Sequence, residues 1–103
     1  MRSMILFEWD EAKAQSNIRK HGVSFELVRS VFIDPFALIE QDRVVGGEAR
    51  WRTIGSTSTG IVLFVAHAIE EQGNFEVVRI ISARRATRRE RELYGQNREK
   101  HIS

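Results

Sequence analysis

The amino-acid sequence predicts an α+β protein, in which a small antiparallel four-stranded sheet accompanies two N-terminal helices and one C-terminal helix. Apolar residues recur at helical spacing behind two N-capping residues in the first third of the chain. Apolar or alternating segments separated by short turns follow, and an arginine-rich segment with a helix-capping pattern comes last. Strands joined by such short turns cannot cross over to lie parallel, so we expect an antiparallel meander. The 103 residues, 42% of them hydrophobic, suffice for one core, and we expect a single domain over residues 1–103.

The first predicted helix covers residues 11–20. Asp10 supplies an N-capping carboxylate, the first turn is acidic, the last turn is basic, and Gly22 suits a left-handed C-cap. Residues 4–9 are a short apolar stretch ahead of this helix, for which a strand is one interpretation. Met1-Arg2-Ser3 is either a vector scar or an alternative start.

The second predicted helix begins after Ser24 and stops at Asp34-Pro35, because proline cannot continue a helix. Its apolar positions are Phe25, Val28, Val31 and Phe32. The glycine- and serine-rich segment 55–60 is expected to be a turn between two strands. The predicted strands cover residues 36–42, 50–54, 61–69 and 75–83.

The last predicted helix covers residues 88–97. It follows Thr87-x-x-Glu90, which has the spacing of a capping box. Because the helix begins at residue 88, Arg84 and Arg85 are expected to lie outside it, where the last strand of the sheet ends. Tyr94 is expected to pack against the sheet, and residues 98–103 are expected to form a frayed tail.

Charge is distributed unevenly along the chain. Residues 79–98 hold seven arginines and two glutamates, a balance of +5, whereas residues 1–78 hold eight basic and eleven acidic side chains, a balance of −3. Guanidinium groups are planar and permanently charged, and they bind phosphate through two hydrogen bonds at once. The segment therefore indicates a polyanionic partner; a solvated helix with ion pairs between successive turns is the alternative.

Composition excludes several kinds of site. The chain has no cysteine, and its three histidines, at positions 21, 67 and 101, include no pair at metal-ligand spacing, so neither a metal site nor a cofactor is expected. The longest apolar runs, such as residues 60–66, are far shorter than the roughly 20 residues that cross a bilayer. We expect a soluble cytoplasmic protein with no membrane partner.

An ordered set of short motifs resembles the BrnT toxins of bacterial type II toxin–antitoxin modules. The resemblance covers residues 7 to 94, with mild departures at Ala49 and His67. It implies a RelE-like fold and a ribonuclease that arrests translation until a cognate DNA-binding antitoxin of the BrnA kind neutralises it. The motifs are Phe7-Glu8-Trp9-Asp10, Lys13, Asn17, Lys20-His21-Gly22-Val23-Ser24-Phe25, Val31-Phe32-Ile33-Asp34, Gly47-Glu48-Ala49-Arg50, Ile54-Gly55 and Arg79-Ile80-Ile81-Ser82-Ala83-Arg84.

RNA cleavage without a metal ion uses the substrate's own 2′-hydroxyl as the nucleophile. The protein must remove one proton, stabilise a dianionic phosphorane and protonate the leaving 5′-oxygen. The candidate catalytic residues are Arg84, Arg79, Glu48, Arg50, Lys20 and His21. The candidate substrate-binding residues are Arg85, Arg88, Arg89 and His67.

Several candidates have a structural alternative. Arg79 is expected on the same side of the last strand as Val77 and Ile81, where Glu48 is its natural ion-pair partner, and Arg84 is expected on the other side. Lys20-His21 is first of all the basic end of a helix. His67, among Val65, Ala66 and Ala68, is more typical of a satisfied, semi-buried histidine than of a ligand-binding one.

Two other function classes remain open. A toxin of the same fold can act on another target, as ParE-like proteins inhibit gyrase without cleaving RNA. A non-catalytic nucleic-acid-binding module is the second alternative, although Tyr94 is the only aromatic residue in the basic region and single-strand binders usually have several. Incubation of the purified protein with RNA, with and without a chelator, is the most informative experiment. Cleavage that the chelator does not affect would support the ribonuclease and exclude the non-catalytic binding module.

Overall fold

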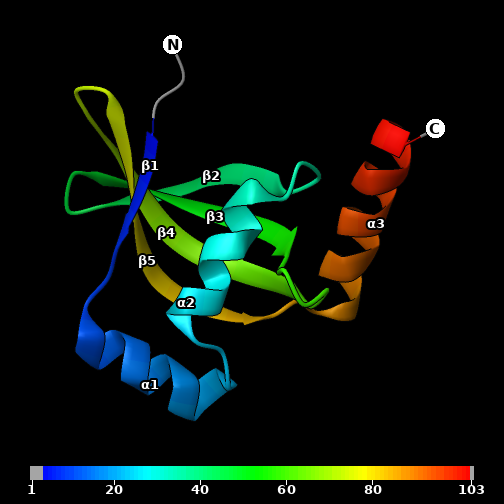
Figure 1. The fold of residues 1–103 in the computed structure, drawn as a ribbon, viewed down its shortest axis with the longest axis horizontal. Helices are drawn as coiled ribbons and strands as arrows, with labels where there is room; N and C mark the ends of the chain where they lie inside the picture. The colour runs from blue at the N-terminus through cyan, green and yellow to red at the C-terminus, as the bar shows by residue number, and fades with distance from the viewer. Residues whose placement is uncertain (1–3, 103) are drawn as a thin grey trace.

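The computed structural model describes residues 4–102, which form three helices, one 3-10 helix and a five-stranded sheet (Figure 1). The sheet order is β1-β5-β4-β3-β2. The strands are β1 (Met4–Glu8), β2 (Leu38–Val45), β3 (Glu48–Ser56), β4 (Val62–Gln72) and β5 (Phe75–Arg85). The helices are α1 (Glu11–His21), α2 (Phe25–Val28), the 3-10 helix η1 (Arg29–Ile33) and α3 (Arg88–Ile102). The α+β class is confirmed, whereas residues 1–3 and 103 lie outside the described part.

Strand β1 makes the sheet mixed. Strands β2 to β5 form the expected antiparallel meander, but β1 adds a fifth strand that pairs in parallel with the start of β5. The prediction of four antiparallel strands is therefore wrong at this edge. The pairing joins residues 4–8 to residues 75–79, which are far apart in the sequence, so no turn residue between them indicates it. An edge strand with four of its five residues exposed also shows no apolar alternation.

The N-terminal helices begin and end close to the predicted positions. Asp10 accepts a hydrogen bond from the Lys13 amide at 3.0 Å, and Gly22 closes α1 with a positive φ of 68°. Ser24 caps α2 in the same way. The second helix is not one continuous α-helix, however, because it tightens into η1 from Arg29 onward. The apolar spacing that predicted it fits both helical forms.

The meander strands are longer than predicted or displaced along the chain. Strand β3 reaches Ser56, so the turn expected over residues 55–60 is confined to the segment after it. The β2–β3 hairpin closes at Gly46 and Gly47, whose φ values of 56° and 80° match the two-residue turn that favours a twisted hairpin.

The core lies between α1, α2 and η1 on one side and one face of the sheet on the other (Figure 1). Its buried members are Ala14, Val23, Phe25, Val28, Val31, Leu63, Val65, Val78, Ile80 and Ala83. Asn17 is also buried, and its amide group binds the backbone oxygens of Val23 and Ala83 and the Ala83 amide, at 2.9–3.0 Å. These hydrogen bonds fasten α1 to the segment of β5 that lies beyond the end of β1.

Helix α3 stands near the end of the sheet at which β5 finishes, apart from the other helices (Figure 1). It continues past Asn97 to Ile102, where a frayed tail was predicted. Phe36 explains the extension, because Asn97 donates to its backbone oxygen at 2.8 Å and its ring contacts Arg98 and His101. No helix in residues 4–102 is long and apolar enough to span a membrane.

Tyr94 is buried as predicted, but it also makes a specific hydrogen bond. Its hydroxyl donates to Asp34 Oδ2 at 2.8 Å, and the same oxygen accepts the Ser56 amide at 2.7 Å. Burial, together with the Asp34 carboxylate, raises the pKa of Tyr94 to about 12. Asp34 therefore joins α3 to the end of β3.

Candidate active site

The face of the sheet opposite α1 and α2 carries the candidate site. Side chains alternate between the two faces of a strand. In β4, Leu63 and Val65 belong to the core, so Phe64, Ala66 and Ala68 face the other way. Because alanine side chains are short, the two alanines make the centre of this second face shallow.

Arginine side chains flank Ala66 and Ala68 on the two neighbouring strands. Arg50 of β3 and Arg79 of β5 are both register partners of Ala68, and Arg52 is the partner of Ala66. The row Arg50–Ala68–Arg79 thus places two guanidinium groups on either side of one small residue. We call the surface formed by Glu48, Arg50, Arg52, Arg79 and Arg84 the arginine face.

A β-bulge brings Arg84 onto the same face as Arg79. The register between β4 and β5 shifts between Ala66 and His67, and Ile81 is left without a partner. One extra residue reverses the alternation beyond it. The prediction that Arg79 and Arg84 point to opposite sides is therefore wrong.

Glu48 connects two of the arginines. Its Oε1 accepts a hydrogen bond from Arg79 Nη2 and lies 3.4 Å from Arg50 Nε. The side chains of Arg79 and Glu48 are each 40% exposed, so this cluster is open to a ligand. The expected Arg79–Glu48 pair is present, with Arg50 as its third member.

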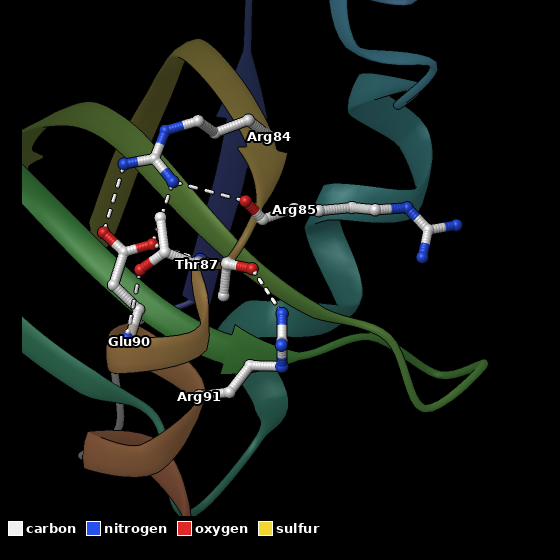
Figure 2. A network of polar contacts seen from close by, with 6 residues as sticks. Arg84, Arg85, Thr87, Glu90 and Arg91 are labelled. Carbon is white, nitrogen blue, oxygen red and sulfur yellow. Dashed lines mark hydrogen bonds and ion pairs between the residues drawn. The ribbon is translucent and has the colours of Figure 1, made fainter.

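Arg84 is held by Glu90 and Phe64 rather than standing free at the strand end. Its Nη1 and Nη2 donate to the two carboxylate oxygens of Glu90 at 2.8 and 3.1 Å, as Figure 2 shows. Its guanidinium carbon lies 4.3 Å from the centre of the Phe64 ring. The hydrogen bonds from Arg84 hold the pKa of Glu90 below its usual range, because they favour the ionised carboxylate.

Arg85, Arg88 and Arg89 lie away from the arginine face. Arg85 extends in the opposite direction from Arg84 (Figure 2), as expected for successive residues of a strand. Arg88 and Arg89 occupy the first turn of α3, where their side chains are 89% and 72% exposed and are loosely paired with Glu92. Their ion-pair partner is Glu92, and they do not contact the Glu48 cluster.

Lys20 and His21 lie at the end of α1, next to β5. With Ile81 and Ser82 they line a cleft of about 150 Å³ between the end of α1 and the bulge. Ser82 is the register partner of Ala66, so it belongs to the same face as the arginines. The cleft therefore adjoins the arginine face across the edge of β5.

His67 cannot bind a substrate in this structure. It is fully buried on the helix-covered face, where its Nε2 lies 2.7 Å from Thr53 Oγ1 and its ring packs on Phe32. Desolvation lowers the pKa of His67 to about 4, so the imidazole is neutral at pH 7. The substrate-binding prediction for His67 is thus corrected, and the alternative of a buried histidine holds.

The sequence did not reveal two supporting residues, Phe64 and Glu90. Glu90 was visible only as the last residue of a capping box, and nothing local showed that its carboxylate reaches back to Arg84. Within residues 4–102 no group of three or more His, Cys, Asp or Glu side chains could hold a metal ion. Fixed positive charge beside a single carboxylate suits the binding of a phosphodiester and the removal of one proton.

Comparisons with known proteins show similarity to one family of ribonuclease toxins. A family model described as the ribonuclease toxin BrnT of the type II toxin–antitoxin system matches residues 9–90. The crystal structure of the Brucella abortus ribonuclease toxin BrnT is similar, with 26% sequence identity and a TM-score of 0.51. That similarity covers 84% of this chain and 100% of the Brucella chain. A comparison with curated proteins gave no significant match.

Proposed function

This chain belongs to the BrnT family of ribonuclease toxins of type II toxin–antitoxin systems, and we propose that it is a metal-independent endoribonuclease that arrests translation in the cytoplasm. We also propose that the fold is RelE-like, as the resemblance to the BrnT toxins implies. The observation that carries it is the arginine face, where Arg50 and Arg79 flank Ala68 beside the Glu48 carboxylate. Preorganised positive charge of this kind stabilises a phosphate that gains negative charge in the transition state.

In the proposed reaction the substrate's 2′-oxygen attacks the adjacent phosphorus. Glu48 accepts the proton of the 2′-hydroxyl, and Arg79 and Arg84 stabilise the dianionic phosphorane. The bond from phosphorus to the 5′-oxygen then breaks, and the leaving oxygen takes a proton. Lys20 and His21, in the cleft that adjoins the arginine face, are our candidates for the donor. The products are a 2′,3′-cyclic phosphate and a free 5′-hydroxyl.

We propose that Arg85, Arg88 and Arg89 guide RNA toward this face, because exposed guanidinium groups attract a polyanion over distances longer than a hydrogen bond. The same exposed arginines of α3 suit a cognate, BrnA-like antitoxin with an acidic or amphipathic segment. Such a complex would bury at least a standard-size interface of roughly 1,600 Å².

The experiment is RNA cleavage by purified protein with and without a chelator. We expect cleavage in both cases, and a loss of about 10²–10³-fold in kcat for Arg84→Ala, as is typical when a transition-state donor is removed. Arg19→Ala, at an exposed position on α1, is the matched control and should keep full activity. Inhibition by the chelator would contradict metal independence. If the protein binds RNA without cleaving it, a nucleic-acid-binding module is favoured. If it neither binds nor cleaves RNA, another target such as gyrase is favoured.

A further inference from the structure

We propose that Glu90 is a positioning residue, which turns one edge of the Arg84 guanidinium toward the phosphate of the substrate. This inference rests on the proposed function and adds a residue to it. Neither the capping pattern nor the charge of the segment assigns Glu90 such a role. The inference follows from which N–H groups of Arg84 are occupied and which remain.

The guanidinium of arginine has five N–H donors and two edges that each accept an anion through two hydrogen bonds. Glu90 occupies the end-on edge, since it accepts from both Nη1 and Nη2 of Arg84. The second N–H of Nη1 donates to the backbone oxygen of Arg85 at 3.2 Å. The remaining donors, on Nε and Nη2, form the side-on edge.

This free edge points away from the groups that hold Arg84. In Figure 2 the Glu90 carboxylate and the Arg85 backbone oxygen lie on one side of the guanidinium, and the Nε edge lies on the other. The Arg84 side chain is 37% exposed, so solvent and ligands can reach it. Two parallel donors on an accessible edge match two oxygens of a phosphate.

Three groups hold Arg84: the Glu90 carboxylate, the backbone oxygen of Arg85 and the Phe64 ring. The Arg84 guanidinium carbon lies over the Phe64 ring, 4.3 Å from the ring centre. Glu90 is itself tied to the start of α3, because its Oε1 also accepts the Thr87 amide at 2.8 Å and its own amide donates to Thr87 Oγ1 at 3.2 Å. The Glu90 side chain is only 17% exposed. A carboxylate held by the capping box in this way supports Arg84 and is not a gate that opens.

The opposite role for Glu90 would be competition, in which its carboxylate occupies the place of the phosphate. The two roles predict opposite outcomes when the carboxylate is removed. A positioning carboxylate, once lost, frees Arg84 to sample many rotamers, and misplacement of about 1 Å at a reacting centre costs on the order of 100-fold in rate. A competing carboxylate, once lost, would increase the affinity for RNA.

The test is Glu90→Gln, which keeps the shape of the side chain and removes the second acceptor oxygen and the charge. We expect kcat/KM for RNA to fall by about 10- to 100-fold, mostly through kcat. Thr87→Ala is the control for the helix cap, because it removes Thr87 Oγ1 and leaves Glu90 on Arg84. Glu92→Gln is the control for charge on the exposed part of α3. Thr87→Ala should lower the melting temperature and keep full activity, and Glu92→Gln should leave both nearly unchanged.

A double-mutant cycle separates an action through Arg84 from a purely structural one. In an Arg84→Ala background, Glu90→Gln should have no further effect on kcat/KM but should still lower the melting temperature. Equal losses of activity in both backgrounds would overturn the proposal, and so would a gain of activity in the single variant.

Binding of a 2′-O-methylated RNA oligonucleotide tests the same residue without cleavage. We expect Glu90→Gln to bind this RNA about tenfold more weakly than the wild-type protein and both control variants do. Equal or tighter binding would overturn the positioning role. If the wild-type protein binds this RNA but cleaves no unmodified RNA, the proposed function fails, and the binding series still decides the role of Glu90.

Discussion

Arg79 and Arg84 lie on the same face of the sheet although they are five positions apart along β5, an odd step that would place them on opposite faces of a regular strand. The bulge at Ile81 removes one step from the alternation, so that Arg79 is level with Ala68 and Arg84 with Phe64. A regular strand would have placed Arg84 against the helices and Arg85 on the arginine face. The bulge therefore determines which of these two adjacent arginines can share a substrate with Arg79.

Arg79→Ala is expected to reduce activity more than stability. The side chains of Arg79 and Glu48 are each 40% exposed, and Glu48 keeps Arg50 as a partner, so the free energy of unfolding should fall by about 1 kcal/mol or less. The RNA cleavage rate should fall by about 100-fold. Chemical denaturation and single-turnover cleavage measure the two effects. A stability loss above about 3 kcal/mol would show that the pair behaves as a buried one.

Charge reversal on α3 is expected to slow association with the antitoxin. Arg88→Glu with Arg89→Glu changes two largely exposed side chains and should lower the association rate about tenfold at low salt, with a weaker dependence on ionic strength. Stopped-flow kinetics with the cognate antitoxin measures the rate. Lys13→Glu with Arg19→Glu on α1 makes the same change in net charge elsewhere. An equal effect from this control would show that only the overall charge matters.

Protonation of His67 is expected to destabilise the protein in mild acid. The pKa of His67 is about 4 in the folded protein and 6.5 in the unfolded chain, so folding favours the neutral imidazole. The stabilisation is complete above pH 6.5 and is lost as the pH falls toward 4, by about 3 kcal/mol in total. His67→Gln removes the titration, and its stability, measured by denaturation from pH 7 to 4, should fall less steeply than that of the wild type. If the free energies of unfolding of the two proteins fall equally with pH, His67 does not titrate in this range.

Glycines 55 and 95 are expected to respond oppositely to alanine. A Cβ at Gly55 would lie 2.8 Å from Val31 Cγ1 and 3.1 Å from Ala37 Cβ, so Gly55→Ala should cost about 1–3 kcal/mol through overpacking. Gly95 lies within α3 and a Cβ there meets nothing within 4 Å, so Gly95→Ala should stabilise the helix by roughly 0.5–1 kcal/mol. Thermal denaturation compares them. A neutral Gly55→Ala would mean that η1 moves freely away from β3.

The sequence predicted features that depend on neighbouring residues. Asp10, Ser24 and Thr87 each form the cap that their spacing indicated, because an N-cap satisfies amide groups within its own turn. The Arg79–Glu48 pair was also foreseen, although its members are 31 positions apart in the sequence, because the short connections of a meander keep β3 and β5 close together.

Features that depend on distant parts of the chain could not be predicted. The parallel pairing of β1 with β5 joins segments that lie far apart in the sequence, residues 4–8 and 75–79, and the bulge at Ile81 leaves no mark in an apolar strand. Burial of His67 depends on Phe32, which packs over it from another element. Residue types thus indicated the chemistry of the site, whereas its arrangement required the folded chain.

Cleavage of RNA with a single 2′-O-methyl group tests the central claim most directly. The substrate carries this group at the nucleotide 5′ to a mapped cleavage position, and the ends of the products are identified by mass spectrometry. We predict a 2′,3′-cyclic phosphate from unmodified RNA and no cleavage at the blocked position, with cleavage unchanged at other sites. Cleavage at the blocked position at the unmodified rate would contradict attack by the 2′-hydroxyl, and with it the role assigned to the arginine face.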